Sequence, residues 1–318
     1  DSFNMLVPHT CKNNLYERYL DVRQQVAIEK ERLLPISASD QVCSKYGVHP
    51  ALPTMKNLYD DGDLLFFANT GHLLQPMTKD DFYKYAKTQS RLFAHNAMQD
   101  DAMTLDPDKV ISGTGILGRM TDILDRNGHN IGSFSVGRNA PTTIGEPEKS
   151  GSPIVLARGT SLPRFHLYGL KDIISKLHNK TELGSGIFAD SWSAAYMDSV
   201  PSAQVLLNAL DTVTTSVQFP NTLLGDSFKT IARLIASREA RGVDVDTFHV
   251  IAKRYDSHKK NNAQIDYNFK DVDSSLSAFV REMKAMDVWD SVTLMQMSEF
   301  GRTLSPNGND GTDHAWGG

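Results

Sequence analysis

An apolar run ends abruptly in polar and charged residues in the stretch VTLMQMSEFGR, residues 292–302. The apolar part, residues 292–297, predicts a strand buried in a sheet. Glu299 and Arg302 follow it directly, at the carboxyl end of the predicted strand. Ligands of open α/β sheets bind beyond the carboxyl ends of the strands, so this edge is where we look for a site.

Working outward, helical patterns alternate with short apolar runs along the chain. Thr78 and Asp81 predict a capping box that opens a further helix. This alternation predicts an α/β fold with a mostly parallel central sheet and helices on both faces, and we expect residues 1–318 to form a single domain. The expected helices lie near 15–26, 50–59, 116–124, 202–217, 223–241 and 276–286, and the expected strands at 64–68, 131–136, 153–157, 248–251 and 292–297.

Composition excludes several classes of protein. Lysine and arginine total 33 against 38 acidic residues, for a net charge of -5, so the basic surface typical of nucleic-acid binding is missing. No apolar run is long enough to cross a bilayer. The chain opens on Asp1 without the pattern of a signal peptide, which indicates a mature or trimmed piece. The oligomeric state is not indicated.

Candidate metal ligands follow two of the predicted strands. Asp256 and His258 come after residues 248–251, Glu299 follows 292–297, and Asp313-His314 ends a turn rich in glycine and asparagine. Carboxylate and imidazole suit zinc, manganese or a similar divalent ion. Each has an ordinary structural alternative, such as a surface loop, an ion pair of Glu299 with Arg302, or an Asx-turn at Asp313. Only their coincidence at corresponding places predicts a metal centre.

Two cysteines, Cys11 and Cys43, are the only ones in the chain. They could form a disulfide in an oxidising compartment or be two free thiols. Asn179-Lys180-Thr181 is a glycosylation acceptor pattern. Together these features lean towards secretion.

A family resemblance covers the whole chain. The string Met297-Ser298-Glu299-Phe300-Gly301-Arg302-Thr303, followed by Asn307-Gly308 and Thr312-Asp313-His314, resembles the signature of an uncharacterised, exported bacterial family of the alkaline-phosphatase-like superfamily. Other elements of that family are resembled, in order, by Asp1-Ser2-Phe3-Asn4 with Val7-Pro8, Val48-His49-Pro50-Ala51-Leu52, Phe93-Ala94-His95-Asn96 and Tyr255-Asp256-Ser257-His258.

The resemblance implies a divalent metal site, with zinc expected first and manganese or calcium as alternatives. Asp313 could ligate directly or orient an imidazole. Arg302, with its planar fork, is expected to hold a phosphate or sulfate group, while His95 and Asn96 contact substrate or metal. The implied ligands are Asp1, Asp256, His258, Glu299, Asp313 and His314.

The implied function is metal-assisted hydrolysis of a phosphate or sulfate ester, on a small molecule or a polysaccharide, outside the cytoplasm. Many relatives carry serine where this chain has Ala94, so a water, or Ser90 one helical turn away, would have to replace that nucleophile. The resemblance also implies that the first strand and the C-terminal part of the family's domain are missing from this chain. The alternative is a non-catalytic extracellular binding or structural protein; a cytosolic protein with neither metal nor disulfide is a third. We expect Cys11 and Cys43 to be bonded.

Overall fold

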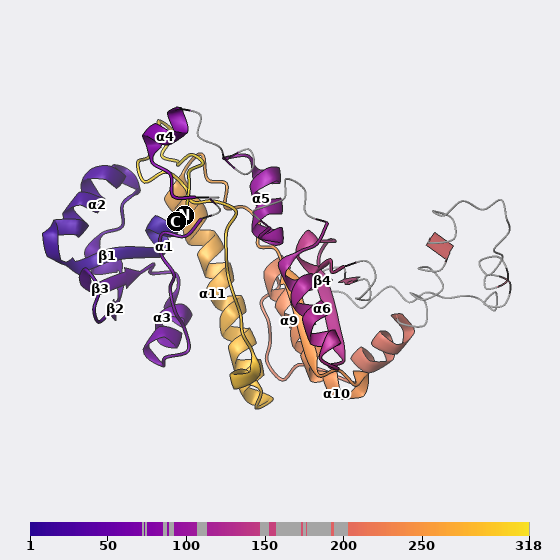
Figure 1. Ribbon diagram of the computed structural model, residues 1–318. Helices are drawn as coiled ribbons and strands as arrows, with labels where there is room; N and C mark the ends of the chain where they lie inside the picture. Colours follow the sequence, from indigo (N-terminus) through magenta and orange to yellow (C-terminus); the bar gives the residue numbers. More distant parts are fainter. Residues whose placement is uncertain are drawn as a thin grey trace.

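Two small β-sheets flank one long helix, α11 (Asn261–Ala285), in a computed structural model of the chain (Figure 1). The structure describes residues 1–71, 73, 75–84, 88, 92–106, 113–146, 153–156, 173, 176, 192–193 and 203–317. None of the helices in this part of the chain is long and apolar enough to span a membrane. The Asn179 glycosylation pattern lies outside the described residues.

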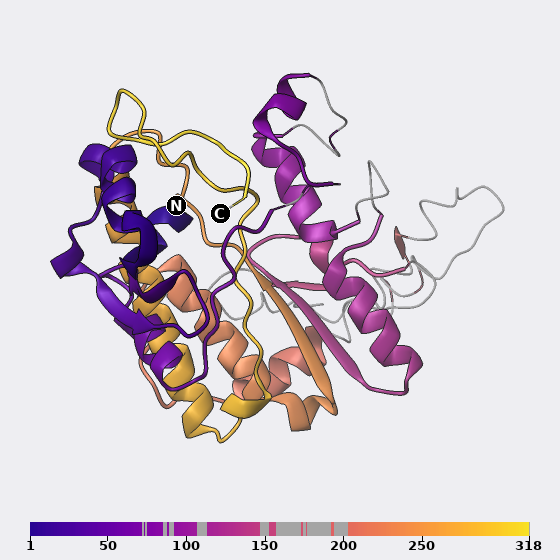
Figure 2. The same cartoon turned by 60° about the vertical axis from the view of Figure 1, so that its left-hand side comes forward.

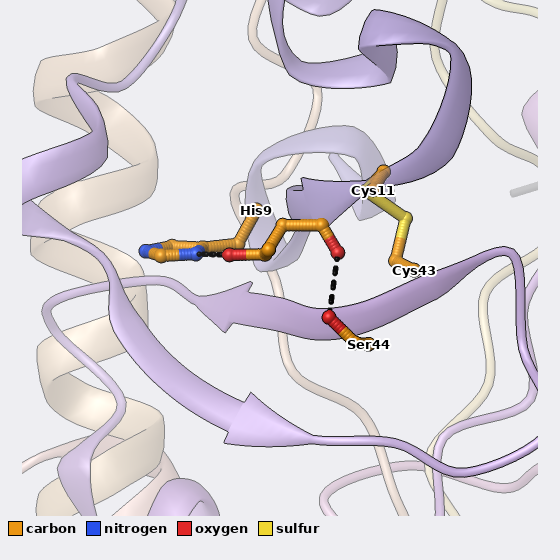
Figure 3. Close-up of a disulfide and its surroundings, with 5 residues drawn as sticks. His9, Cys11, Cys43 and Ser44 are labelled. Carbon is orange, nitrogen blue, oxygen red and sulfur yellow. Dashed lines mark hydrogen bonds between the residues drawn. A yellow bond between two sulfur atoms is a disulfide. The ribbon is translucent and has the colours of Figure 1, made fainter.

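The first sheet is antiparallel, with strand order β1-β3-β2. Its strands are β1 (Leu6–Cys11), β2 (Leu34–Ser37) and β3 (Cys43–Val48), and α2 (Leu15–Arg23) packs against β1. Cys11 lies opposite Cys43 in the ladder, so strand pairing itself brings the two thiols together. Their Cα atoms are 3.8 Å apart and the predicted disulfide is confirmed (Figure 3).

The second sheet is parallel, with strand order β5-β4-β6. Its strands are β4 (Ile131–Val136), β5 (Ile154–Leu156) and β6 (Val245–Val250), and Phe134 pairs with both Ile154 and Phe248. Helices α9 (Leu223–Ala236) and α11 pack on one side, and α6 (Ile116–Arg126) contacts β4 from the other (Figure 2). The shared core includes Phe134, Val136, Leu156, Ile231, Leu234, Phe279 and Met283.

Helix α11 joins the two halves of the molecule. It packs against α9 and, on its other side, against α3 (Pro53–Asp60). The sequence predicted only its last part, from residue 276. The apolar spacing is interrupted before that point by Asn268, Asp273 and Ser275, which are nevertheless buried. Asp273 can be buried because its carboxylate accepts hydrogen bonds from the backbone N–H and the hydroxyl of Thr54, at the start of α3.

Two predicted strands are wrong. Residues 64–68 and 292–297 belong to neither sheet, and the described strands form no large central sheet. Leu65 and Phe67 are 69% and 79% exposed, and Met295 is 76% exposed. Leu64 and Phe66, by contrast, pack against the core around Leu52 and Phe269. The apolar run at residues 64–68 therefore belongs to a segment with one buried side, and not to a strand that is buried on both faces.

Most other predicted elements are confirmed, with shifted ends. Residues 203–211 are helical, the helix predicted over 223–241 is interrupted at Ser237, and the Thr78–Asp81 capping box opens α4. The remaining helices are α1 (Ser2–Met5), α4 (Lys79–Tyr83), α5 (His95–Thr104), α10 (Arg238–Arg241) and the short 3-10 turns η1 (Lys12–Asn14), η2 (Gln24–Val26), η3 (Lys30–Arg32), η4 (Pro141–Thr143) and η5 (Trp289–Ser291).

Candidate metal centre

Three segments far apart in the chain meet beside the start of α11. His95 is the first residue of α5, and Asp256 and His258 lie in the connection from β6 to α11. Glu299 and His314 belong to the C-terminal loop, residues 299–317, whose trace passes close to the connection before α11 (Figure 1).

A hairpin-like pairing gives the C-terminal loop its shape. Arg302 and His314 form an antiparallel β-bridge. The N–H of Gly301 donates to the carbonyl of Trp316 at 2.7 Å, and that of Thr303 donates to the carbonyl of Asp313 at 2.8 Å. This pairing places the Asp313-His314 dipeptide beside Arg302.

The turn of the same loop is fixed by Asn307 and Gly311. The Asn307 Oδ1 accepts from the N–H groups of Asn309 and Gly311, and its Nδ2 donates to the carbonyl of His258 at 3.1 Å. A Cβ at Gly311 would lie 2.1 Å from that same carbonyl oxygen. Only glycine permits this approach, so the turn docks on the segment that carries His258.

The carboxylate of Asp256 is the centre of the site. Its Oδ1 lies 2.7 Å from Arg302 Nη1, 2.9 Å from His258 Nε2 and 3.0 Å from His314 Nε2. Its Oδ2 lies 3.4 Å from His95 Nε2. Burial opposes ionisation. Hydrogen bonds from Arg302 and from a protonated His314, with the charges of a protonated His258 and of Arg302, outweigh it, so the pKa of Asp256 is well below its usual value.

His95, Asp256 and His314 form a group that could hold a metal ion. Each offers one donor atom, and the three atoms lie within 4.8 Å of one another. The side chain of Asp256 is 44% exposed, so the group opens to solvent. An ion could therefore enter from outside.

A backbone carbonyl fixes the tautomer of His314. Its Nδ1 lies 2.6 Å from the carbonyl oxygen of Phe93, which can only accept, so Nδ1 carries the hydrogen. Phe93 has a φ of 70°, a left-handed conformation that is unfavourable for a bulky residue. That strained backbone supplies the acceptor, and the Nε2 of a neutral His314 is left as a lone pair.

Carboxylates fix the other two imidazoles in the same way. His95 Nδ1 lies 2.8 Å from Glu299 Oε1, and His258 Nδ1 lies 2.9 Å from Asp313 Oδ1. Hydrogen bonds from Asn307 and then from His258 lower the pKa of Asp313, which keeps it an ionised acceptor. Both imidazoles therefore use Nδ1 as the donor and turn Nε2 towards Asp256.

As a consequence, the unprotonated Nε2 atoms of two neutral imidazoles, which are both hydrogen-bond acceptors, lie in contact. His258 Nε2 and His314 Nε2 are 3.0 Å apart, and both face Asp256 Oδ1. With Nδ1 protonated in each neutral imidazole, none of these three atoms has a hydrogen to share. A cation among them, either a proton or a metal ion, is needed to relieve the repulsion.

Asp1 lies deeper than the other predicted ligands. Its side chain is fully buried, with Oδ2 bonded to Arg23 and, at 2.9 Å, to the Nδ2 of Asn261. Its Oδ1 is buried and has no hydrogen-bond partner among the described residues. Asp1 is linked to the site through Asn261, whose Oδ1 lies 3.4 Å from the hydroxyl of Thr312, and is not part of the three-residue group.

The residues predicted to contact substrate have different surroundings. Arg302 is buried, and its guanidinium bonds Asp256 and the hydroxyl and carbonyl of Thr312, so it holds the carboxylate in place. Asn96 is exposed in the first turn of α5, where Ala94 is the N-cap residue without a side-chain capping bond. Ser90 lies outside the described residues. Contact of Arg302, His95 and Asn96 with a substrate stays a prediction.

Several supporting groups escaped the sequence analysis. The turn at Asn307 was visible as a loop, but its bond to His258 was not. Thr312, which anchors Arg302, was noted only as part of a motif. The carbonyl of Phe93 has no sequence signal, because any residue carries one.

A comparison of the sequence with known protein families gives a match to the C-terminal part of the chain. Residues 196–318 match one family profile. The family profile that matches them is described as "Protein of unknown function (DUF1501)". No curated protein and no solved structure matches the chain. The matched segment contains Asp256, His258, Glu299 and His314, whereas His95 precedes it. The wider superfamily stays a prediction.

Proposed function

We propose that this protein is a divalent-metal-dependent hydrolase of phosphate or sulfate esters, with a metal site formed by His95, Asp256, His258 and His314. The observation that carries the proposal is the 3.0 Å contact between the Nε2 atoms of His258 and His314, both aimed at Asp256. Imidazoles and one carboxylate suit zinc, whereas calcium prefers oxygen ligands throughout. Zinc is therefore the proposed ion.

The surrounding acidic residues act mainly as orienting groups in this proposal. Metal-binding histidines commonly donate their other N–H to a carboxylate or a carbonyl, which fixes the ring and raises its basicity. Glu299 does this for His95 and Asp313 for His258. Asp1 is kept as a candidate ligand, since its buried and unpartnered Oδ1 is the kind of atom that a cation would satisfy.

A bound divalent ion would polarise an ester oxygen and stabilise the charge that develops on it. The first turn of α5, which begins at His95, adds backbone N–H groups without a side-chain cap, a favourable arrangement for an oxyanion. Ala94 offers no hydroxyl there, so the proposed nucleophile is a water molecule.

Ala94 also supports a second candidate function. A chain without a nucleophile at this position could bind an anionic ester and not cleave it. Both candidates place the protein outside the cytoplasm, as the Cys11–Cys43 disulfide favours. A fold resemblance alone does not choose between them.

The test is to measure the zinc content and the hydrolysis of aryl phosphates and aryl sulfates for the purified protein and two variants. His314→Ala should lose zinc and any hydrolysis together. His129→Ala is the matched control, because His129 is exposed in the turn after α6, and it should retain both. Zinc bound without hydrolysis would favour the binding protein. A wild-type protein that takes up no divalent metal would rule out the proposal.

A further inference from the structure

Arg138 lies at the carboxyl edge of the parallel sheet, immediately after β4. Gly137, with a φ of 105°, turns the chain at the end of the strand. The hydroxyl of Ser135 donates to the carbonyl of Arg138 at 2.5 Å and holds the turn. The arginine is therefore presented at the sheet edge where ligands of parallel sheets bind.

A single amide connects Arg138 to the metal centre. Arg138 Nη2 donates to Gln99 Oε1 at 3.4 Å, and Gln99 Nε2 donates to Glu299 Oε1, also at 3.4 Å. Gln99 follows His95 by one turn of α5, and Glu299 is the acceptor for His95. The guanidinium of Arg138 is thus adjacent to the residues that orient the imidazole of His95.

Within the described residues, no carboxylate neutralises the charge of Arg138. It is exposed, and in the part of the chain that the structure describes no carboxylate lies within ion-pair distance of it. Arg302, by comparison, is paired with Asp256, and Arg241 with Asp246. Burial, and secondarily the charge of Arg138, lower the pKa of His249 to about 4, so this neighbour is neutral at neutral pH.

We infer that Arg138 binds the terminal anionic oxygens of the substrate, so that the substrate is a phosphate or sulfate monoester and not an uncharged ester. The inference rests on the proposed function. The site itself holds three carboxylates, Asp256, Glu299 and Asp313, whose charge a zinc ion and the paired guanidinium of Arg302 would together only balance. An anionic group approaching that site needs a cation at the rim, and a guanidinium fork matches two oxygens of a phosphate or sulfate.

The experiment measures binding of inorganic phosphate and inorganic sulfate by calorimetry, with and without zinc. Wild-type protein is compared with Arg138→Gln, Arg138→Lys and the control Arg281→Gln. Arg281 is exposed near the far end of α11, about 30 Å from the start of that helix at 1.5 Å per residue. Its Nε donates to the carbonyl of Ser277, one turn earlier in the same helix. Zinc affinity is measured for every variant.

We expect Arg138→Gln to weaken anion binding by about tenfold to a hundredfold, the usual effect of losing a charged hydrogen bond. Arg138→Lys should recover part of it, and zinc affinity should not change. Equal anion binding by wild type and Arg138→Gln would overturn the inference and leave the proposed function standing. So would a wild type that hydrolyses esters without binding either anion. If zinc is not retained but anion binding still falls in Arg138→Gln, Arg138 is an anion-binding residue and the proposed metal-dependent function fails.

Discussion

Histidines at the starts of two helices show how differently one residue type can be used. His49 precedes α3 and is 4% exposed, its Nδ1 accepts from the N–H of Ala51, and its ring packs edge-on against Phe269. Burial lowers its pKa to about 4, so it is a neutral core residue. His95 begins α5, has a 36% exposed side chain and contacts two carboxylates. Exposure and acidic partners, and not the local sequence, separate the two.

The hydrogen bond from His95 to Glu299 can be tested with a single substitution. We expect Glu299→Gln to lower zinc affinity by about tenfold to a hundredfold, the range observed when the hydrogen-bond partner of a metal-binding histidine is changed. The amide oxygen can still accept from His95 Nδ1, but it lacks the negative charge that raises the basicity of the ring. Zinc titration against a competing chelator measures the effect.

The matched control is Glu239→Gln, which makes the same chemical change at an 89% exposed position of α10. It should bind zinc like the wild type. Unchanged zinc affinity in Glu299→Gln would show that Glu299 neither orients His95 nor binds the ion.

At the scale of elements, the C-terminal loop matters more to the site than any helix or strand. Residues 299–317 contribute Glu299, Arg302 and His314, and they are held by a β-bridge and by the turn at Asn307. The apolar segment before the loop, residues 292–297, joins neither sheet. The residues of the motif therefore lie in one loop beside Asp256, although the strand expected to support that loop was wrong.

Gly311 tests how far the site depends on the docking of this loop. A Cβ at Gly311 would lie 2.1 Å from backbone atoms of His258, so Gly311→Ala must displace either the turn or that segment. We expect a lower melting temperature and a zinc affinity weakened together with it. Thermal unfolding monitored by circular dichroism and a zinc titration provide the two measurements.

Gly308→Ala is the control from the same turn, because a Cβ at Gly308 would have no atom within 4 Å. It should match the wild type in both measurements. If Gly311→Ala also binds zinc normally, the loop does not need the close approach that the structure shows.

At the scale of the whole molecule, α11 is the element that unites the fold. It packs against α9 of the parallel-sheet half and α3 of the antiparallel half, and its first residue, Asn261, bonds Asp1. The candidate metal centre lies beside this end of the helix. Its geometry therefore depends on both halves of the molecule being in place.

The disulfide ties down the antiparallel half. Cys11 and Cys43 are 32 residues apart in sequence, and the loop-entropy relation assigns such a cross-link about 3–4 kcal/mol of the free energy of unfolding. We expect reduction to shift the denaturant midpoint downwards by a corresponding amount. Urea unfolding with and without a reducing agent measures it.

The double variant Cys11→Ser/Cys43→Ser should have the lower midpoint already and show no further response to the reducing agent. A wild-type midpoint that does not move on complete reduction, checked by mass spectrometry, would show that strand pairing alone stabilises this half.

The sequence by itself determined the features that depend on local pattern. Helical periodicity located α2, α3, α6 and α9, and the capping box at Thr78 located α4. The motif around Glu299 and the Asp313-His314 pair pointed to the residues that gather around Asp256. The helix predictions succeeded because spacing and capping act between neighbours in the chain.

Only the tertiary structure decided which atoms face one another. It separated Asp1, paired with Arg23, from the group around Asp256, and it turned Arg302 inwards to hold that carboxylate. It also left the apolar residues 64–68 and 292–297 outside both sheets. A run of apolar residues predicts that its side chains will be buried. The residues that bury them come from distant parts of the chain, so the run alone does not predict a strand. For the same reason, the Nε2 contact between His258 and His314 could not be read from either residue's neighbours.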